Sequence, residues 1–262
     1  MGTRHEMSST ADSLTSRETL TQWFGGEPGA SMLRAGSQKL RQILPNLFGY
    51  HLLQLGRYGA EDLLSVSRIS HRACLHIDPD SPPAAGESAV CRAAALPLAA
   101  DSVDVLVLPH VLEFESDPHQ VLREVERVLI GEGHVVIIAF NPWSLCGLLK
   151  VVLAWRAQAP WSGRFLGMAR LREWLQLLGF EMVSCHHFFY RPPIRSSRLL
   201  DRLGFVEKLG AYLLNRFGGA YVMVAKKRLL TLIPVRPQWN LRRRHVAAGL
   251  AEPSARSSVI HD

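Results

Sequence analysis

The sequence predicts an α/β fold built on a mostly parallel sheet, and three features of residues 96–133 support this. Two unbroken apolar runs, 105–108 and 135–138, are rich in β-branched residues and too short for helices, which is typical of strands buried on both faces. Between them, Asp117 and Pro118 mark the start of an amphipathic helix. A strand, a helix and a strand in so short a segment indicate a right-handed parallel crossover, the unit of Rossmann-like sheets.

The segment before this unit begins with a polar stretch. Residues 1–30 are predicted to form a polar N-terminal extension, disordered over about the first 20 residues. A helix is predicted over 31–44, where apolar residues lie on one rough face and Pro45 ends the pattern. Strands are predicted over 50–55, 73–77 and 89–92.

After the crossover, the pattern predicts one more helix and two more strands. Gly131 is expected to end the crossover helix in a left-handed conformation. Apolar spacing over 166–178 predicts a helix that Gly179 stops, and strands follow at 180–189 and 220–225. These elements give seven strands in all, with a tail at 229–262 that is basic and predicted to be disordered.

Composition limits the class of protein. The 262 residues, 47% of them hydrophobic, suit one α/β domain with extensions. The four cysteines are scattered without a Cys-x-x-Cys pair, so we expect no metal site and no disulfide framework, and a reducing cytoplasm is the simplest location. The start of the chain lacks a signal-peptide pattern, and the longest apolar segment, 145–155, is too short for a transmembrane span.

The positive charge is concentrated near the C-terminus. The formal net charge is +7, but residues 226–245 contain seven Lys and Arg and no acidic residue, and the remaining chain is balanced at 23 of each sign. Trp239 lies among these basic residues, an arrangement that can contact phosphates and bases. Weak nucleic-acid binding by the tail is one hypothesis, and a merely solvated tail is the other.

The motifs of residues 96–133 resemble those of the type 11 class I methyltransferases. They are Leu96-Pro97, Asp104 before the first buried run, His110-Val111-Leu112-Glu113, Asp117-Pro118, and a Gly-x-Gly at 131–133. The resemblance implies a seven-stranded Rossmann-like sheet with helices on both faces and an antiparallel last strand, in a domain spanning 31–228. It also implies S-adenosylmethionine as cofactor and transfer of its methyl group to an acceptor that the sequence does not identify.

The resemblance also assigns residues to the cofactor site: Gln54, Gly56, Tyr58, Gly59, Asp78, Ala94, Leu96 and His110. Only Gly56 is in register with the glycine-rich loop of the family, because Tyr58 replaces one glycine and Gly59 is offset by one position. Asp78 is placed to accept hydrogen bonds from the ribose hydroxyls. Arg92 stands where an acidic residue usually meets adenine, so the backbone of Ala94 and Leu96 would have to recognise the base.

Other polar residues are assigned to the acceptor. His110 is a candidate base that removes a proton from the acceptor, and Glu113, Asn141 and Trp143 are candidate acceptor contacts. Insertions at 141–163 and 191–219 follow carboxyl ends of strands and are expected to shape the acceptor pocket. The alternatives are that His110 only lies beside the cofactor, that the aromatic residues only pack, and that the insertions lie far from the ligand.

Two other functions compete with methyl transfer. The altered glycine loop and Arg92 favour a catalytically silent methyltransferase-like module that binds a protein or RNA. A nicotinamide-dependent oxidoreductase would need a Gly-x-Gly-x-x-Gly turn, which the sequence lacks after its first strand.

Overall fold

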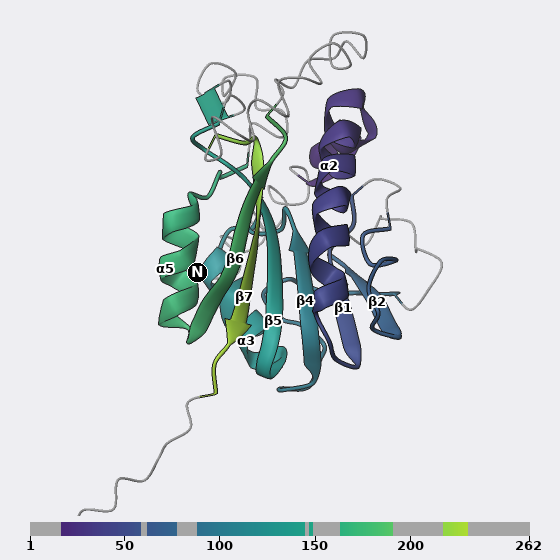
Figure 1. Ribbon diagram of the computed structural model, residues 1–262, viewed down its shortest axis with the longest axis vertical. Coiled ribbons are helices and arrows are strands. Elements are labelled where there is room, and N and C mark those ends of the chain that lie inside the picture. The colour runs from purple at the N-terminus through teal and green to yellow at the C-terminus, as the bar shows by residue number, and fades with distance from the viewer. Residues whose placement is uncertain are drawn as a thin grey trace, which may run out of the picture. The chain divides into compact units, whose positions relative to one another are not determined.

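The computed structural model describes residues 17–58, 62–77, 88–144, 147–148, 163–190 and 217–229, and these residues define the fold (Figure 1). They all belong to the first of the two units into which the chain divides, Met1–Leu229. No helix within the described ranges is both long and apolar enough to cross a bilayer.

Seven strands form one sheet in the order β3-β2-β1-β4-β5-β7-β6 (Figure 1). Their bounds are β1 His51–Leu55, β2 His71–His76, β3 Ser88–Val90, β4 Val103–Pro109, β5 Leu129–Phe140, β6 Phe180–Phe188 and β7 Ala220–Lys227. The first five strands pair in parallel, whereas β7 lies between β5 and β6 and runs antiparallel to both. The predicted mostly parallel sheet with an antiparallel last strand is therefore confirmed.

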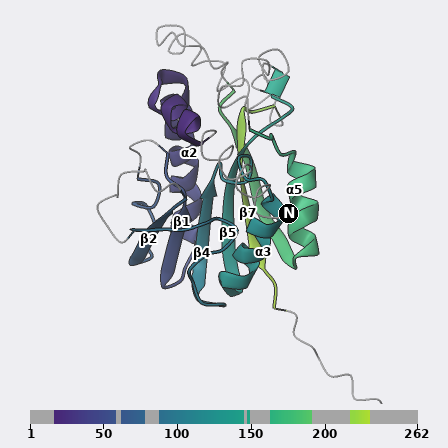
Figure 2. The ribbon, with the colours of Figure 1, turned by 180° about the vertical axis from the view of Figure 1, so that it is seen from behind.

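The central strands are buried on both faces, as their unbroken apolar runs predict. Val105 and Val107 of β4 face one hydrophobic core, and Leu106 and Leu108 face the other, because successive side chains of a strand point to opposite faces. Helix α2 (Glu27–Ile43) covers the first face, while α3 (Pro118–Val128) and α5 (Met168–Leu177) cover the second (Figure 2).

The N-terminal segment differs from the prediction. Helix α2 begins at Glu27 rather than at residue 31, because Pro28 is accommodated in the first turn, where its missing N–H costs no hydrogen bond. Residues 17–25 are also helical, and Leu20 and Phe24 are fully buried in the first core. The part of the predicted polar extension that the structure describes is therefore a packed element of the fold.

The start of α3 agrees with the prediction, but its end does not. Asp117 caps the helix by accepting hydrogen bonds from the N–H groups of His119 and Gln120. The helix ends at Val128, and the chain passes directly into β5, so the expected left-handed stop at Gly131 is wrong. The left-handed residue is Glu132, with φ 69°. A Cβ on Gly131 would meet only the side chain of Leu229, which is exposed and flexible, so this contact does not by itself require a glycine.

The C-terminal half follows the predicted pattern. Helix α5 ends before Gly179, which has the expected left-handed φ of 82°. The insertion at 141–163 is described only at 141–144, 147–148 and 163, and that at 191–219 only at 217–219, so their predicted role lies outside the described residues. The same holds for the tail beyond residue 229.

Candidate functional site

The candidate site lies at the carboxyl ends of β1, β2, β4 and β5, where parallel sheets of this kind bind ligands. Gly56 directly follows β1 and has a φ of 80°, a conformation that favours glycine. Its N–H donates to the carbonyl of Leu75 at 2.7 Å, and its own carbonyl accepts from the Gln54 side chain at 2.8 Å. A Cβ at this position would lie 3.3 Å from Cδ1 of Ile77. The turn is thus fixed on both sides and needs glycine.

Tyr58 lies over this turn. Its side chain is buried, and its hydroxyl donates a 3.4 Å hydrogen bond to the backbone carbonyl of His110. Its ring centroid is 5.4 Å from that of Phe24. The aromatic residue that replaces a family glycine therefore connects the end of β1 to the end of β4 and fills space that a glycine would leave open.

His110 and Glu113 form a buried pair where β4 ends. The Nδ1 atom of His110 lies 3.2 Å from Oε1 of Glu113, and the same oxygen accepts from the N–H of Phe140 at 2.8 Å. In the tautomer that carries its proton on Nδ1, His110 donates to Glu113 and Nε2 carries no proton. The backbone of His110 is itself held in a left-handed conformation, φ 49°, with its N–H bonded to Ile138.

Tyr221 of β7 is a buried polar group that interacts electrostatically with Glu113. Burial, and next the charge of Glu113, raise the pKa of Tyr221 well above its usual range. Its hydroxyl donates to the carbonyl of Leu166 at 2.9 Å. The phenol therefore stays protonated and serves as a structural hydrogen-bond donor.

Aromatic rings of the helix at 17–25 and of β5 cover His110. The ring of Phe24 lies 5.2 Å from the imidazole, and Phe140 lies 4.2 Å from it on the β5 side. His110 is only 2% exposed as a result. Residues 17–25 thus close this part of the site.

Arg17 is the residue at this site that the sequence analysis missed. It is 3% exposed and forms an ion pair with Glu115, which follows β4. Its Nε and Nη1 atoms have no hydrogen-bond partner among the described residues. Arg17 lines a cavity of about 20 Å³ with Thr21, Gly56, Arg57, Tyr58, His76 and Ile77. The signal that could have found it is the helical spacing of Leu20, Trp23 and Phe24, which marks a packed helix inside the supposed extension.

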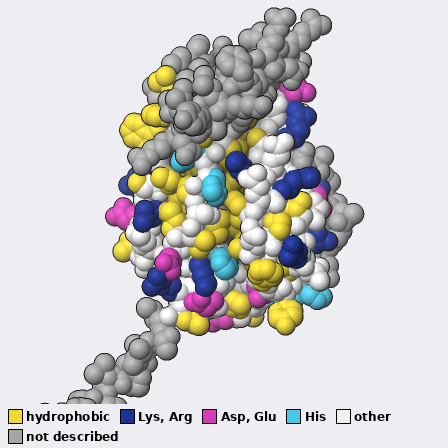
Figure 3. Space-filling model, in the orientation of Figure 1, with side chains coloured by type: hydrophobic (Ala, Val, Ile, Leu, Met, Phe, Trp, Pro, Cys, Tyr) yellow, Lys and Arg dark blue, Asp and Glu magenta, His cyan; other side chains and the backbone are white. Residues whose placement is uncertain are grey.

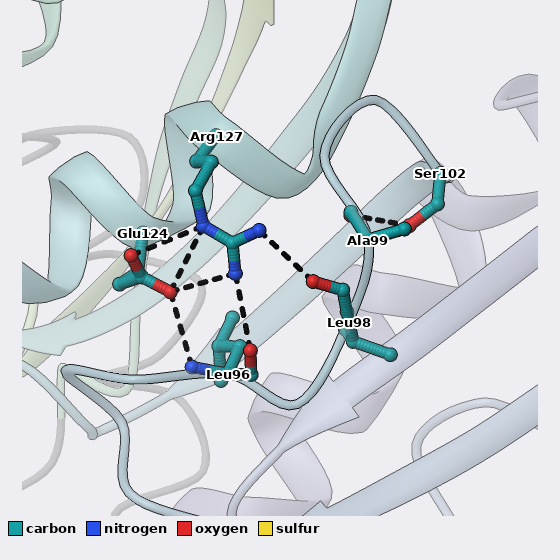
Figure 4. A network of polar contacts seen from close by, with 6 residues as sticks. All are labelled: Leu96, Leu98, Ala99, Ser102, Glu124 and Arg127. Carbon is teal, nitrogen blue, oxygen red and sulfur yellow. Dashed lines mark hydrogen bonds and ion pairs between the residues drawn. The ribbon is translucent and has the colours of Figure 1, made fainter.

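The backbone of Leu96, expected beside adenine, is occupied by side chains of α3. Its N–H donates to Glu124 at 3.1 Å, and its carbonyl accepts from Arg127 at 3.0 Å (Figure 4). Arg127 also donates to the carbonyl of Leu98 at 2.9 Å. The hydrogen bond from Arg127 lowers the pKa of Glu124. This network ties the loop that contains Leu96 and Leu98 to α3. The half-buried Ala94 is then the remaining candidate for backbone contact with a base.

Asn141 and Trp143, predicted at the acceptor, lie in different environments. Asn141 is buried and donates from its side chain to the carbonyl of Gly218 at 2.9 Å, while its Oδ1 accepts from the N–H of Trp143 at 3.0 Å. Trp143 is 77% exposed. Asn141 therefore has a structural task in joining the ends of β5 and β7. Gly59 and Asp78 lie outside the described residues.

Comparison with known proteins now identifies the domain. Residues 63–137 match the family model described as a methyltransferase domain. Over 233 residues, the chain is 33% identical to the uncharacterized protein YafS of Escherichia coli K12, covering 86% of this chain and 90% of YafS. The chain belongs to the YafS family. The sheet order and the family-model match at 63–137 together show that this YafS-family chain carries a class I methyltransferase domain.

Solved structures share the fold at low sequence identity. An S-adenosylmethionine-dependent methyltransferase from Thermotoga maritima aligns with a TM-score of 0.58 and 16% identity, covering 79% of this chain and 94% of that one. One from Archaeoglobus fulgidus aligns with a TM-score of 0.51 and 18% identity, covering 73% and 93%. The [4+2]-cyclase SpnF aligns with a TM-score of 0.51 and 15% identity, covering 74% and 80%. The fold by itself therefore does not decide the reaction.

Proposed function

We propose that this YafS-family protein is an S-adenosylmethionine-dependent methyltransferase that acts on an acceptor still to be identified. The observation that carries the proposal is the Gly56 turn, which lies at the carboxyl end of β1 in a class I methyltransferase domain, next to the buried His110–Glu113 pair. The cysteine pattern leads us to propose the cytoplasm as its location.

The described residues fit the amino-acid end of S-adenosylmethionine in their chemistry. Gly56 presents backbone that no Cβ shields, and the buried guanidinium of Arg17 has two nitrogens without partners among the described residues. The cavity between them measures about 20 Å³, which is room for about one water molecule. Binding of the whole cofactor therefore requires the helix at 17–25 to move outward.

The residues around the sheet edge would position reactants rather than supply a nucleophile. When bound, S-adenosylmethionine supplies an already activated methyl group. Glu113 fixes the orientation and the tautomer of His110, so that Nε2 is the atom able to accept a proton from an acceptor. Oriented reactants by themselves can account for about 7–11 kcal/mol of a barrier.

Calorimetric titration tests this proposal. We expect S-adenosylmethionine and S-adenosylhomocysteine to give binding heat and to raise the melting temperature, whereas NADH, the ligand of the oxidoreductase alternative, gives neither. If millimolar S-adenosylmethionine and S-adenosylhomocysteine give no binding heat and leave the melting temperature unchanged, the proposal is refuted. The catalytically silent binding module is then the better hypothesis.

A further inference from the structure

The helix at 17–25 brings a buried positive charge to the Gly56 turn. Arg17 is 3% exposed, and the residues that line its cavity include a second arginine, Arg57, but no carboxylate among those described. A buried guanidinium with unmade hydrogen bonds is costly, because burial removes the water that would otherwise satisfy its N–H groups. The cavity is therefore suited to an anionic group.

The partner that Arg17 already has indicates which anion. Glu115 places a carboxylate on the Nη2 side of the guanidinium, and Nε and Nη1 have no partner among the described residues. The planar fork of a guanidinium matches the two oxygens of a carboxylate, which gives strong and directional hydrogen bonds. The ion pair with Glu115 shows that Arg17 pairs with a carboxylate at this place in the fold.

We propose that Arg17 binds the carboxylate of the amino-acid part of S-adenosylmethionine, which takes the place of Glu115. This inference rests on the proposed function, because that carboxylate is the acidic group of the cofactor. Glu115 is the more exposed partner, with 14% of its side chain accessible against 4% for Arg17, so it reaches water more readily when it is displaced. The same movement of the helix at 17–25 that admits the cofactor then brings Arg17 back onto it.

The sharpest test compares two ligands that differ by one carboxylate. S-adenosylhomocysteine carries the group, and its decarboxylated analogue does not. In calorimetric titrations, we expect Arg17→Ala to weaken binding of S-adenosylhomocysteine about tenfold to hundredfold, as for hydrogen bonds to a charged group. Binding of the decarboxylated analogue should change by less than about twofold.

Control variants separate this role from a structural one. Arg34→Ala removes an exposed arginine of α2 that pairs with Glu27, and it should change neither affinity. Arg17→Lys keeps the charge but loses the fork, so it should weaken S-adenosylhomocysteine binding less than Arg17→Ala does, and it replaces that variant if the latter does not fold. Glu115→Gln removes the competing carboxylate and should bind S-adenosylhomocysteine more tightly than the wild type.

The outcomes separate this inference from the proposal beneath it. If the wild type binds neither S-adenosylmethionine nor S-adenosylhomocysteine, the proposed function fails and the inference fails with it. If the wild type binds both, but Arg17→Ala and Arg17→Lys weaken the two test ligands by equal factors or not at all, only the inference is overturned. A carboxylate-specific loss in Arg57→Ala instead of the Arg17 variants would also overturn it, and weaker binding by Glu115→Gln would contradict the exchange.

Discussion

Phe24 provides a direct measure of how firmly the N-terminal helix belongs to the fold. The side chain is 1% exposed, and its ring lies within 5.4 Å of Tyr58 and 5.2 Å of His110 between centroids. Replacing a buried Phe by Ala costs about 3–5 kcal/mol, and lost aromatic contacts account for about 0.5–1.5 kcal/mol per pair. We expect Phe24→Ala to lower the free energy of unfolding by about 4 kcal/mol.

Urea denaturation followed by tryptophan fluorescence measures this loss. With an m-value of about 2–3 kcal/mol per M, the midpoint of the urea titration should fall by roughly 1.3–2 M. Phe48→Ala is the matched control, because Phe48 is 70% exposed, and its removal should cost less than about 0.5 kcal/mol. If both variants lose less than about 1 kcal/mol, the helix does not contribute to the cooperative core and the reasoning is refuted.

Four further predictions concern single contacts and the tail. Gly56→Ala should destabilise the protein by about 1–2 kcal/mol, because a left-handed φ strains any residue with a Cβ. The control is Gly25→Ala at the end of a helix, where a Cβ meets nothing within 4 Å, and it should show no such cost in the same urea titration. Glu124→Gln should be less stable than the wild type at pH 7 by about 1 kcal/mol. Because the folded pKa of Glu124 is lowered, that difference should shrink as the pH falls below about 4, and a constant difference would count against the ion pair. Asn141→Ala leaves two backbone groups unpaired and should cost about 2–3 kcal/mol in thermal melts, whereas a neutral result would remove its structural role. If the full chain binds RNA or DNA with an affinity that falls as salt rises, removal of residues 236–262 should abolish that binding. Equal affinity with and without these residues would exclude the tail as the contact.

The surface charge supports testing the tail separately from the domain. On the face shown in Figure 3, Lys and Arg side chains are spread over the described surface and alternate with acidic ones. Ion pairs account for several basic side chains of the described residues, including Lys227 with Asp101 and Arg228 with Glu181.

The elements that the sequence predicted well are those whose signals are local. The runs at 105–108 and 135–138, the Asp117 cap and the Gly179 stop each depend on neighbouring residues, and each is confirmed. The surroundings of Gly131 are not local, since the nearest side chain is that of Leu229, about 100 positions away. Sequence spacing carries no information on such an approach.

Hydrophobic periodicity, caps and turn residues act over short distances, so the sequence predicted the fold and the edge at which parallel sheets of this kind bind ligands. What covers that edge depends on long-range packing. Packing brings Phe24 against His110 and buries Arg17 beside Gly56. The backbone of Leu96 is hydrogen-bonded by the side chains of Glu124 and Arg127. Each of these contacts joins residues 28 or more positions apart, and packing, not local propensity, brings them together. Tyr58 and the helix at 17–25 therefore fill the space next to Gly56 and close the candidate site there.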